Sequence, residues 1–288
     1  MILYKKKTDL QDYLLLQKRN SRRTGFVPTM GALHDGHLSL IERSRRDNSK
    51  TICSIFINPT QFNDPGDFEK YPITIEQDIY RLESAGCDVL FLPSVNEIYP
   101  DKVASLSKAD KFYNLGHLET ILEGKFRPGH FQGVCMVMNR LLDIVRADNL
   151  YLGQKDYQQC MVIARLIELM GLRDSIKVNI CPTLREVDGL AMSSRNLRLN
   201  KEERKKAPSI YQSLQYIKKN LQKGNLESLR AKAVAYLEAN GFKVDYVEIA
   251  DAASLQIINE WNGKTNLVAL AAAFLNEVRL IDNLLLNE

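Results

Sequence analysis

The first 180 residues alternate between short apolar runs and longer stretches in which apolar residues recur at helical spacing. The short runs predict strands at residues 25–28, 51–57, 88–93, 149–153 and 176–180. The stretches between them predict helices at about 36–48, 75–85, 131–145 and 157–170. The run TICSIFI at 51–57 is apolar almost throughout, as expected for a strand covered on both faces. Strands separated by helices of this length predict βαβ units and a mostly parallel, doubly wound sheet.

The pattern changes after about Leu184. Charged amphipathic helices are predicted at 201–221 and 226–239, followed by strand-like runs at 243–250, 265–274 and 276–281. Helices followed by strands predict a separate α+β unit. We therefore expect an α/β, Rossmann-like domain at 1–184 and a smaller α+β C-terminal domain at 185–288. The polar, Arg- and Ser-rich segment at about 184–200 lies at their junction and suggests a functional hinge.

The composition is that of an ordinary globular protein and sets limits on its partners. Of 288 residues, 45% are hydrophobic and 26% charged, and 39 Lys and Arg against 35 Asp and Glu leave a net charge of +4. This balance does not suggest a dedicated nucleic-acid binder, but it is compatible with an anionic small molecule held by a few placed cations. The longest apolar run, 267–275, is well short of the roughly 20 residues that a membrane-spanning helix needs.

The N-terminus and the cysteines indicate a reduced, cytoplasmic protein. The first residues, MILYKKK, lack the order of charged, apolar and small residues that a secretory signal has. The five cysteines are an odd number and contain no Cys-x-x-Cys spacing, so disulfides and a cysteine zinc site are not expected. Cys53, Cys135 and Cys160 lie among apolar neighbours, which predicts buried thiols.

The segment PTMGALHDGHLS at 28–39 combines a strand end, a glycine-containing turn and two histidines. The backbone N–H groups and the dipole of a helix N-terminus favour phosphate there. Gly31 and Gly36 let the backbone come close to a ligand. His34 and His37 lie on one helical face, where both can donate hydrogen bonds to phosphate oxygens as charge builds in a transition state. Taken alone, such a pair is also compatible with metal binding or with helix capping.

With His34-Asp-Gly-His37 in place of His-Ile-Gly-His, this segment resembles the HIGH motif of a nucleotidyltransferase superfamily. A second stretch, GLAMSSRN at 189–196, resembles the mobile Lys-Met-Ser-Lys-Ser loop of class I aminoacyl-tRNA synthetases, with Arg195 in the final basic role. Two hydroxyls beside a guanidinium suit a leaving pyrophosphate, because arginine makes bidentate contacts with phosphate oxygens. Alone, Met-Ser-Ser-Arg would more often be a solvated turn; paired with the histidine motif it is much more specific.

Three further blocks narrow the resemblance to the pantothenate synthetase (pantoate–β-alanine ligase) family. They are FINPTQF at 56–62, RPGHFQG at 127–133 and GQKDYQQ at 153–159. The five blocks follow the family's order over most of residues 25 to 200, and the last third resembles the family's smaller domain in layout. In its own chemistry, the Gln61 amide can donate and accept, which suits a substrate with hydroxyls and a carboxylate. It also follows a predicted strand, at the sheet edge where open α/β folds bind ligands.

The resemblance implies a set of site residues. The implied catalytic residues are His37, His34 and Lys155. The implied ATP-binding residues are Met30, Gly31, Ala32, Leu33, His34, Asp35, Gly36, His37, Gly153, Gln154, Lys155, Asp156, Leu184, Met192, Ser193, Ser194 and Arg195. Those implied for pantoate and β-alanine are Gln61, Gln159, Met30, Asn58 and His130. No metal ligands are identified.

The implied reaction is the ATP-dependent condensation of (R)-pantoate with β-alanine to pantothenate, AMP and pyrophosphate, through a pantoyl adenylate. ATP is then a substrate, and Mg²⁺ would bridge its phosphate oxygens while keeping several waters. The resemblance also suggests a homodimer, and neither nucleic acid nor a membrane is an expected partner.

The sequence departs from the family's usual pattern at three positions. Gln154 stands where the family commonly has Glu, which changes the charge at the nucleotide edge and leaves the roles of Lys155 and Asp156 intact. Gln77 interrupts an acidic stretch, so a role of that stretch in metal or amine binding is in doubt. Thr60 replaces a common methionine, a change that we expect to be tolerated.

Three other functions stay open at this point. A nucleotidylyltransferase would transfer AMP to a phosphate ester and never form an amide. An aminoacyl-tRNA synthetase fits less well, because the chain is short and no tRNA-binding appendage is visible. A catalytically silent nucleotide-binding regulator would bind ATP without releasing pyrophosphate.

Overall fold

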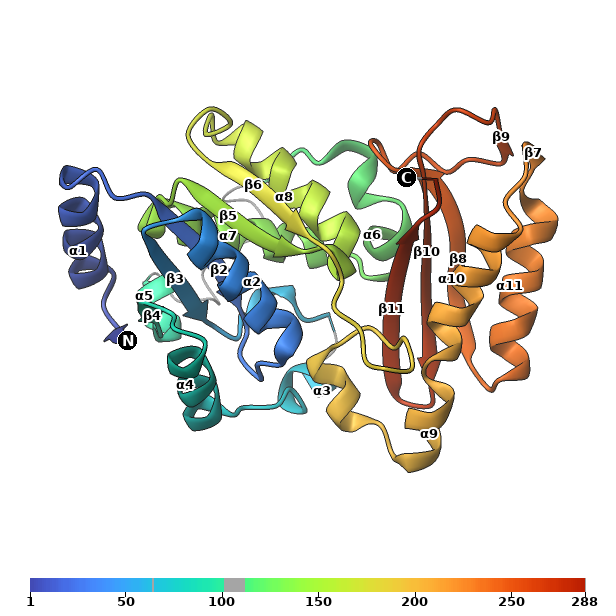
Figure 1. The fold of residues 1–288 in the computed structure, drawn as a ribbon, viewed down its shortest axis with the longest axis horizontal. Coiled ribbons are helices and arrows are strands. Elements are labelled where there is room, and N and C mark those ends of the chain that lie inside the picture. The colour runs from blue at the N-terminus through green and yellow to red at the C-terminus, as the bar shows by residue number, and fades with distance from the viewer. Residues whose placement is uncertain (64, 101–111, 288) are drawn as a thin grey trace. The chain divides into compact units, whose positions relative to one another are not determined.

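The computed structural model describes residues 1–63, 65–100 and 112–287 (Figure 1). The chain divides into two compact units, which are described separately. Unit 1 comprises Met1–Gly153 and Gln158–Pro182. Unit 2 comprises Gln154–Tyr157 and the chain from Thr183 onwards.

Unit 1 is built on a six-stranded sheet in which all neighbouring strands are parallel. Its order is β1-β4-β3-β2-β5-β6. The strands are β1 (Ile2–Tyr4), β2 (Thr24–Thr29), β3 (Lys50–Ile55), β4 (Val89–Phe91), β5 (Asn149–Gly153) and β6 (Lys177–Cys181). The chain winds outward from β2 in one direction and from β5 in the other, so the strand order reverses between these two neighbours. The carboxyl ends of strands at such a reversal are where doubly wound folds bind ligands.

Helices and 3-10 turns connect these strands. The helices are α1 (Lys7–Arg19), α2 (Asp35–Asp47), α3 (Pro65–Glu69), α4 (Ile75–Ser84), α5 (Val95–Ile98), α6 (Leu122–Phe126), α7 (His130–Val145) and α8 (Tyr157–Leu169). The 3-10 turns are η1 (Pro59–Gln61), η3 (Gly116–Glu119) and η4 (Gln154–Asp156). Helix α2, which follows the histidine motif, packs against β2, β3 and β5. Strand β3 is buried at five of its six positions, as its apolar run predicted.

The predicted parallel, doubly wound sheet is confirmed, and so is the burial of the Cys53, Cys135 and Cys160 thiols. The sequence pattern missed the first strand and first helix. Strand β1 is only three residues long and is held by its pairing with β4, in which Ile2 lies opposite Val89. A run this short gives no periodic signal, so only the tertiary pairing defines it.

Unit 2 contains a three-stranded antiparallel sheet, in the order β11-β10-β8, with helices α10 and α11 packed on it. The strands are β8 (Lys243–Asp251), β10 (Leu267–Leu275) and β11 (Val278–Leu285), with a separate pair β7 (Gly224–Asn225) and β9 (Glu260–Trp261). The helices are η5 (Ser194–Arg198), α9 (Lys201–Lys206), α10 (Ser209–Lys219) and α11 (Glu227–Ala239). The sheet face and the helices bury one apolar cluster that includes Leu214, Leu237 and Ile249.

The α+β character predicted for this part of the chain is confirmed, with one difference. The single helix expected at 201–221 is two helices, α9 and α10, separated at Ala207 and Pro208. Proline has no backbone N–H to donate and its ring crowds the preceding turn, so it ends one helix and begins the next. Among the residues that the structure describes, no helix is both long and apolar enough to cross a membrane.

Candidate active site

The loop between β2 and α2 carries the histidine motif at the point where the strand order of unit 1 reverses. Two of its residues have left-handed backbone conformations, with φ of +81° at Gly31 and +47° at Ala32. A left-handed residue with a Cβ costs about 1–2 kcal/mol, so something must hold Ala32 in place. The loop is fixed by hydrogen bonds of its backbone N–H groups and by Leu33, which is buried in the apolar core of unit 1.

Asp78 supplies two of those bonds from the first turn of α4. Its carboxylate accepts from the N–H of Ala32 at 2.9 Å and from the N–H of Leu33 at 2.8 Å, and the Thr74 hydroxyl also donates to it. Asp78 is 1% exposed. The sequence interpretation considered Asp78 only as part of the acidic stretch interrupted by Gln77, and not as a support of the loop. A signal for that role was visible, because an aspartate stands four residues before Leu82, on the buried face of an amphipathic helix.

The hydrogen bonds of this loop change how it can meet ATP. The Gly31 N–H donates to Thr29 Oγ1, and the His34 N–H donates to Nδ1 of His37 at 3.4 Å. Together with the two bonds to Asp78, the amides of residues 31–34 all have acceptors inside unit 1. These four backbone N–H groups therefore hold the loop itself, unlike the free N–H groups that the sequence analysis expected to meet a phosphate.

His34 and His37 lie next to one another, with ring centroids 4.0 Å apart. His34 is the N-cap residue of α2 and His37 its third residue, so the arrangement includes the helix capping that the sequence left open. Since Nδ1 of His37 accepts a hydrogen bond, the neutral ring carries its proton on Nε2. That tautomer presents a hydrogen-bond donor suited to a phosphate oxygen.

Four residues predicted for substrate binding lie together in unit 1. Gln61 donates from Nε2 to the Met30 sulfur at 2.9 Å and accepts at Oε1 from the Asn58 amide at 3.1 Å. Asn58 is 1% exposed, and its amide also contacts Gly133 O and the Tyr99 hydroxyl. Burial raises the pKa of Tyr99, so its hydroxyl stays a donor to Asn58. Asn58 is thus engaged with protein groups and fixes the orientation of Gln61.

His130, at the start of α7, holds the same turn from the other side. Its Nδ1 lies 2.8 Å from the backbone oxygen of Gln61, and its Nε2 lies 3.1 Å from a guanidinium nitrogen of Arg127. A carbonyl only accepts and a guanidinium only donates, so His130 is neutral with its proton on Nδ1. Gln159 lies in the first turn of α8 and is half-buried.

The remaining predicted residues lie mostly in unit 2. Lys155 and Asp156 form η4, with Nζ of the lysine 3.6 Å from Oδ1 of the aspartate. Asp156 is 46% exposed, so this ion pair alone adds little to stability. Gly153 ends β5 in unit 1, and Asp35, on α2, pairs with Arg81 on the surface of that unit.

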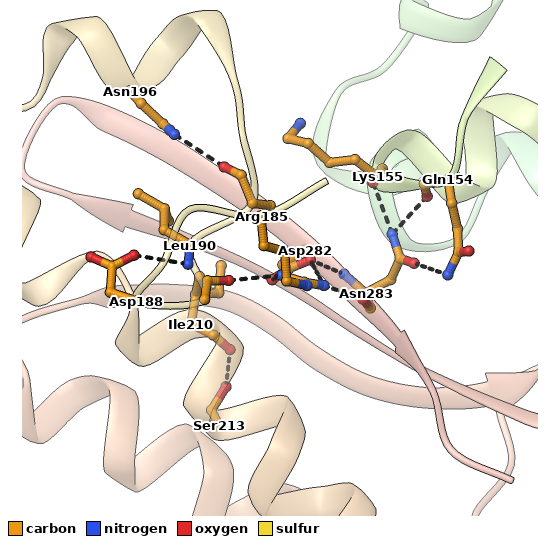
Figure 2. Close-up of polar contacts among 12 residues, drawn as sticks. Gln154, Lys155, Arg185, Asp188, Leu190, Asn196, Ile210, Ser213, Asp282 and Asn283 are labelled. Carbon is orange, nitrogen blue, oxygen red and sulfur yellow. Dashed lines mark hydrogen bonds and ion pairs between the residues drawn. The ribbon is translucent and has the colours of Figure 1, made fainter. Parts of the chain in front are cut away.

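The predicted pyrophosphate loop follows a tight hairpin of unit 2 (Figure 2). Met192 N–H donates to Leu184 O across this hairpin, and the Ser193 hydroxyl accepts from the N–H of Arg195 at the start of η5. The Asn196 amide donates to Ala191 O at 3.0 Å. Ser194 is buried, and Met192, Ser193 and Arg195 are half-buried. These bonds fix the path of the backbone on both sides of the two serines.

Arg185 ties the hairpin to β11. Its guanidinium makes a two-pronged contact with the Asp282 carboxylate, at 2.7 and 3.0 Å, and also donates to Gly189 O at 3.1 Å. Its Cζ lies 3.7 Å from the ring centroid of Tyr211, a cation–π contact. Burial raises the pKa of the Asp282 carboxyl, and the contacts with Arg185 oppose that rise. The sequence interpretation singled out neither Arg185 nor Asp282.

The structure thus brings the predicted residues together in three groups. Met30, Asn58, Gln61 and His130 share one cluster of contacts in unit 1, and His34 and His37 form a separate pair in the same unit. Lys155 and the loop at 192–195 are held within unit 2. Within the described ranges 1–63, 65–100 and 112–287, no cluster of three or more His, Cys, Asp or Glu side chains could hold a metal ion.

Comparison with protein families and with known proteins gives a consistent result. The family model described as pantoate-beta-alanine ligase matches residues 2–285. A pantothenate synthetase of Cytophaga hutchinsonii is 42% identical over 280 residues, which cover 96% of each chain. One from Leptospira biflexa is 42% identical over 286 residues, covering 98% of each.

Comparison with solved structures points to the same family. The pantothenate synthetase of Thermus thermophilus is 37% identical and superposes with a TM-score of 0.85 over the whole of both chains. The pantoate-beta-alanine ligase of Francisella tularensis, solved with "Beta-gamma ATP" and β-alanine, is 38% identical with a TM-score of 0.80, covering 99% of this chain and 97% of that one. With a family match from end to end, and relatives this similar over nearly their full length, the chain belongs to the pantoate-beta-alanine ligase family.

Proposed function

We propose that this chain condenses (R)-pantoate with β-alanine at the expense of ATP, through a pantoyl adenylate. The observation that carries this proposal is the pair His34 and His37 at the N-terminus of α2, at the strand-order reversal of a chain that belongs to this family. The Francisella relative solved with an ATP compound and β-alanine supports ATP and β-alanine as substrates.

The first step joins pantoate to the adenylyl group. A carboxylate oxygen of pantoate attacks the α-phosphorus of ATP, and the bond to the β-phosphate oxygen breaks to release pyrophosphate. Negative charge builds on the phosphate oxygens, so catalysis consists of positioning and charge stabilisation. In the proposal, His37 donates from Nε2, His34 assists it, and Lys155 with the loop Ser193, Ser194 and Arg195 meets the phosphates.

The second step forms the amide. The neutral amine of β-alanine attacks the activated acyl carbon, the bond to the AMP oxygen breaks, and the amine loses a proton. No covalent bond to the protein is needed, because AMP is the leaving group. Gln61 and Gln159 hold the pantoate hydroxyls and carboxylate, with Met30, Asn58 and His130 shaping that side of the site.

The other ATP contacts follow from the loops already described. Met30, Gly31, Ala32 and Leu33 lie along the nucleotide; the amides of the last three already donate to Thr29 and Asp78, so they are not proposed as phosphate donors. Gly153, Gln154, Asp156, Leu184 and Met192 line the nucleotide, together with Asp35 and Gly36. Mg²⁺ would enter with ATP and supply charge neutralisation at the phosphates; among residues 1–63, 65–100 and 112–287 no cluster of three or more His, Cys, Asp or Glu side chains is available to hold it alone.

Three further parts of the proposal concern organisation. Residues 1–184 form the catalytic domain and residues 185–288 a lid that carries the pyrophosphate loop. The enzyme works as a homodimer in the cytoplasm. Its partners are the three small-molecule substrates.

The experiment is exchange of labelled pyrophosphate into ATP, with Mg²⁺ and no β-alanine, with and without pantoate. Pantoate-dependent exchange is the expected result, since it requires reversible adenylation of the pantoate carboxylate. Exchange independent of pantoate, or ATP binding without exchange, would contradict the proposal. A requirement for β-alanine in product formation separates this ligase from an enzyme that transfers AMP to a phosphate ester.

His37→Ala tests the assignment of the motif. We expect it to slow single-turnover adenylation by about 100-fold or more, as loss of a transition-state donor does, with pantoate affinity little changed. The matched control is His117→Ala, a substitution at an exposed histidine of η3 in the same unit. Equal adenylation rates for the two variants would contradict the role of His37.

A further inference from the structure

Lys155 lies on a turn that is held by one side chain from the last strand of the chain. Asn283, in β11, donates from Nδ2 to the backbone oxygens of Gln154 and Lys155, both at 2.9 Å. The Gln154 side chain returns a bond from Nε2 to Asn283 Oδ1 at 3.3 Å. Figure 2 shows the amide lying between the strand and the turn, so that a single side chain fixes consecutive carbonyl groups.

The chemistry of these contacts matches a side-chain amide. Two carbonyl oxygens need a group with two N–H donors, and asparagine is the shortest neutral side chain that has them. An aspartate has the same shape but only acceptors, so it would face both carbonyls with negative charge. Asn283 is 2% exposed, and an unpaired buried amide is costly, so its bonds to the turn must be kept in the folded unit.

The neighbouring residue of β11 performs a similar task for the second segment. Asp282 holds Arg185, and Arg185 holds the hairpin that leads to the loop at 192–195, including a bond to Gly189 O. Arg185 also donates to the backbone oxygen of Asn283 at 3.2 Å. Two segments separated by about thirty residues in sequence therefore rest on two consecutive residues of one strand.

We propose that Asn283 is a positioning residue for Lys155, and that with Asp282 it makes β11 the common support of both phosphate-binding segments. This inference rests on the proposed function, in which Lys155 meets the phosphates of ATP. Asn283 acts through the backbone of the turn and touches no substrate. Replacing Asn283 keeps Lys155 in the chain but removes the hydrogen bonds that fix the turn, and with it the position of the Lys155 ammonium group.

The test is a double-mutant cycle on pantoate-dependent pyrophosphate exchange, with Asn283→Ala, Lys155→Ala and the double variant. We expect Asn283→Ala alone to slow exchange about 10- to 100-fold, the size of effect that a misplaced catalytic group produces, with the KM for pantoate little changed. In the Lys155→Ala background the same substitution should have almost no effect. Equal fold-changes in both backgrounds, or no effect of Lys155→Ala itself, would overturn the inference.

Asn287→Ala is the matched control. Asn287 follows β11 and makes the same kinds of bond in the same unit, donating to Thr265 O and accepting from the Leu267 N–H. Its loss should therefore leave exchange near the wild-type rate. Asn283→Asp sharpens the test, because it keeps the shape and removes the two donors; it should slow exchange at least as much as Asn283→Ala. An Asn283→Asp variant with wild-type exchange would overturn the inference.

A second readout is independent of activity. Hydrogen–deuterium exchange should become faster in peptides that contain 154–157 when Asn283 is replaced by Ala, and in those around 265–267 for Asn287→Ala. Unchanged protection at 154–157 would overturn the positioning role. If the wild-type protein showed no pantoate-dependent exchange, the proposed function would fail, while the amide protection would still decide whether Asn283 holds the turn.

Discussion

The loop before α2 in unit 1 and the turn before α8 in unit 2 are held by side chains of opposite chemistry. Asp78 accepts hydrogen bonds from the amides of Ala32 and Leu33. Asn283 donates hydrogen bonds to the carbonyls of Gln154 and Lys155. The first support uses up backbone donors and the second uses up backbone acceptors. A loop whose backbone N–H groups already donate to protein acceptors must bind an anion through its side chains. That is the task proposed for His34 and His37.

The two supports also differ in how far along the chain they come from. Asp78 is 46 and 45 residues from its two partners, whereas Asn283 is 129 and 128 residues from its own. Loop-closure entropy rises by only about 0.6 kcal/mol for each doubling of length, so distance alone separates them by about 1 kcal/mol. The more important difference between Asp78 and Asn283 is the chemistry of their surroundings. One support contributes a buried carboxylate, and the other belongs to a strand that also carries a buried ion pair.

That ion pair gives the largest expected effect. Asp282→Ala leaves the Arg185 guanidinium mostly buried without its carboxylate, and breaking a buried pair from one side costs about 3–5 kcal/mol. We expect the free energy of unfolding, measured by urea denaturation, to fall by that amount, and pyrophosphate exchange to fall with it. The control is the double variant Asp282→Ala, Arg185→Met, which removes the uncompensated charge and should recover part of the loss. A single variant that loses less than the double variant would contradict this account.

The next effect is expected in unit 1. Asp78→Asn keeps the shape of the side chain but turns one oxygen into an NH₂ group that faces a backbone N–H. One loop amide then loses its acceptor, which costs about 1–3 kcal/mol in the free energy of unfolding. We also expect slower adenylation, because the loop before His34 is freed from one side.

Asp143→Asn is the matched control for Asp78→Asn, since Asp143 is an exposed aspartate of the same unit, with its side chain 63% accessible. It should change neither stability nor adenylation appreciably. If Asp78→Asn resembled this control in both measurements, the loop would have to be held by its other contacts. Asp78 could then no longer be compared with Asn283 as a side chain that holds a loop of the site.

Much of the fold could be predicted from the sequence because parallel strands and their helices carry strong periodic signals. The strand run at 51–57 and the helix at 157–170 agree with β3 and α8 to within two residues at each end. The histidine motif was placed correctly between a strand and a helix for the same reason. The glycine-containing turn expected between them is present, and Gly31 has a φ of +81° there.

The supports of the site were harder to predict because they break the local pattern. The last strand was expected at 276–281, but β11 continues to Leu285. Asp282 and Asn283 are both poor strand formers, so the propensity signal stops just where the strand becomes important. Only the pairing with β10, in which Asn283 lies opposite Leu270, keeps these residues in the sheet. Asp78 was similarly hidden, as one carboxylate on an otherwise apolar helix face.

The smallest effect is expected at the tip of the same hairpin that Arg185 holds. Asp188 there pairs with Arg204, and both side chains are more than a third exposed, at 42% for Asp188 and 35% for Arg204. Exposed pairs contribute at most about 1 kcal/mol, so Asp188→Asn should lower the free energy of unfolding by less than that and leave pyrophosphate exchange unchanged. The hydrogen bond from Arg204 lowers the pKa of the Asp188 carboxyl in the folded chain.

The pH dependence of that small difference provides the sharper test. Because the folded pKa lies below the unfolded value of about 3.9, the stabilisation is fully present above that value and disappears as the pH falls through the folded pKa. The stability of the wild type should therefore approach that of Asp188→Asn in acid and exceed it slightly at neutral pH. A difference as large as that for Asp282→Ala, or one that grows in acid, would mean that an exposed carboxylate supports the hairpin as strongly as a buried one. The contrast between surface and buried supports within unit 2 would then fail.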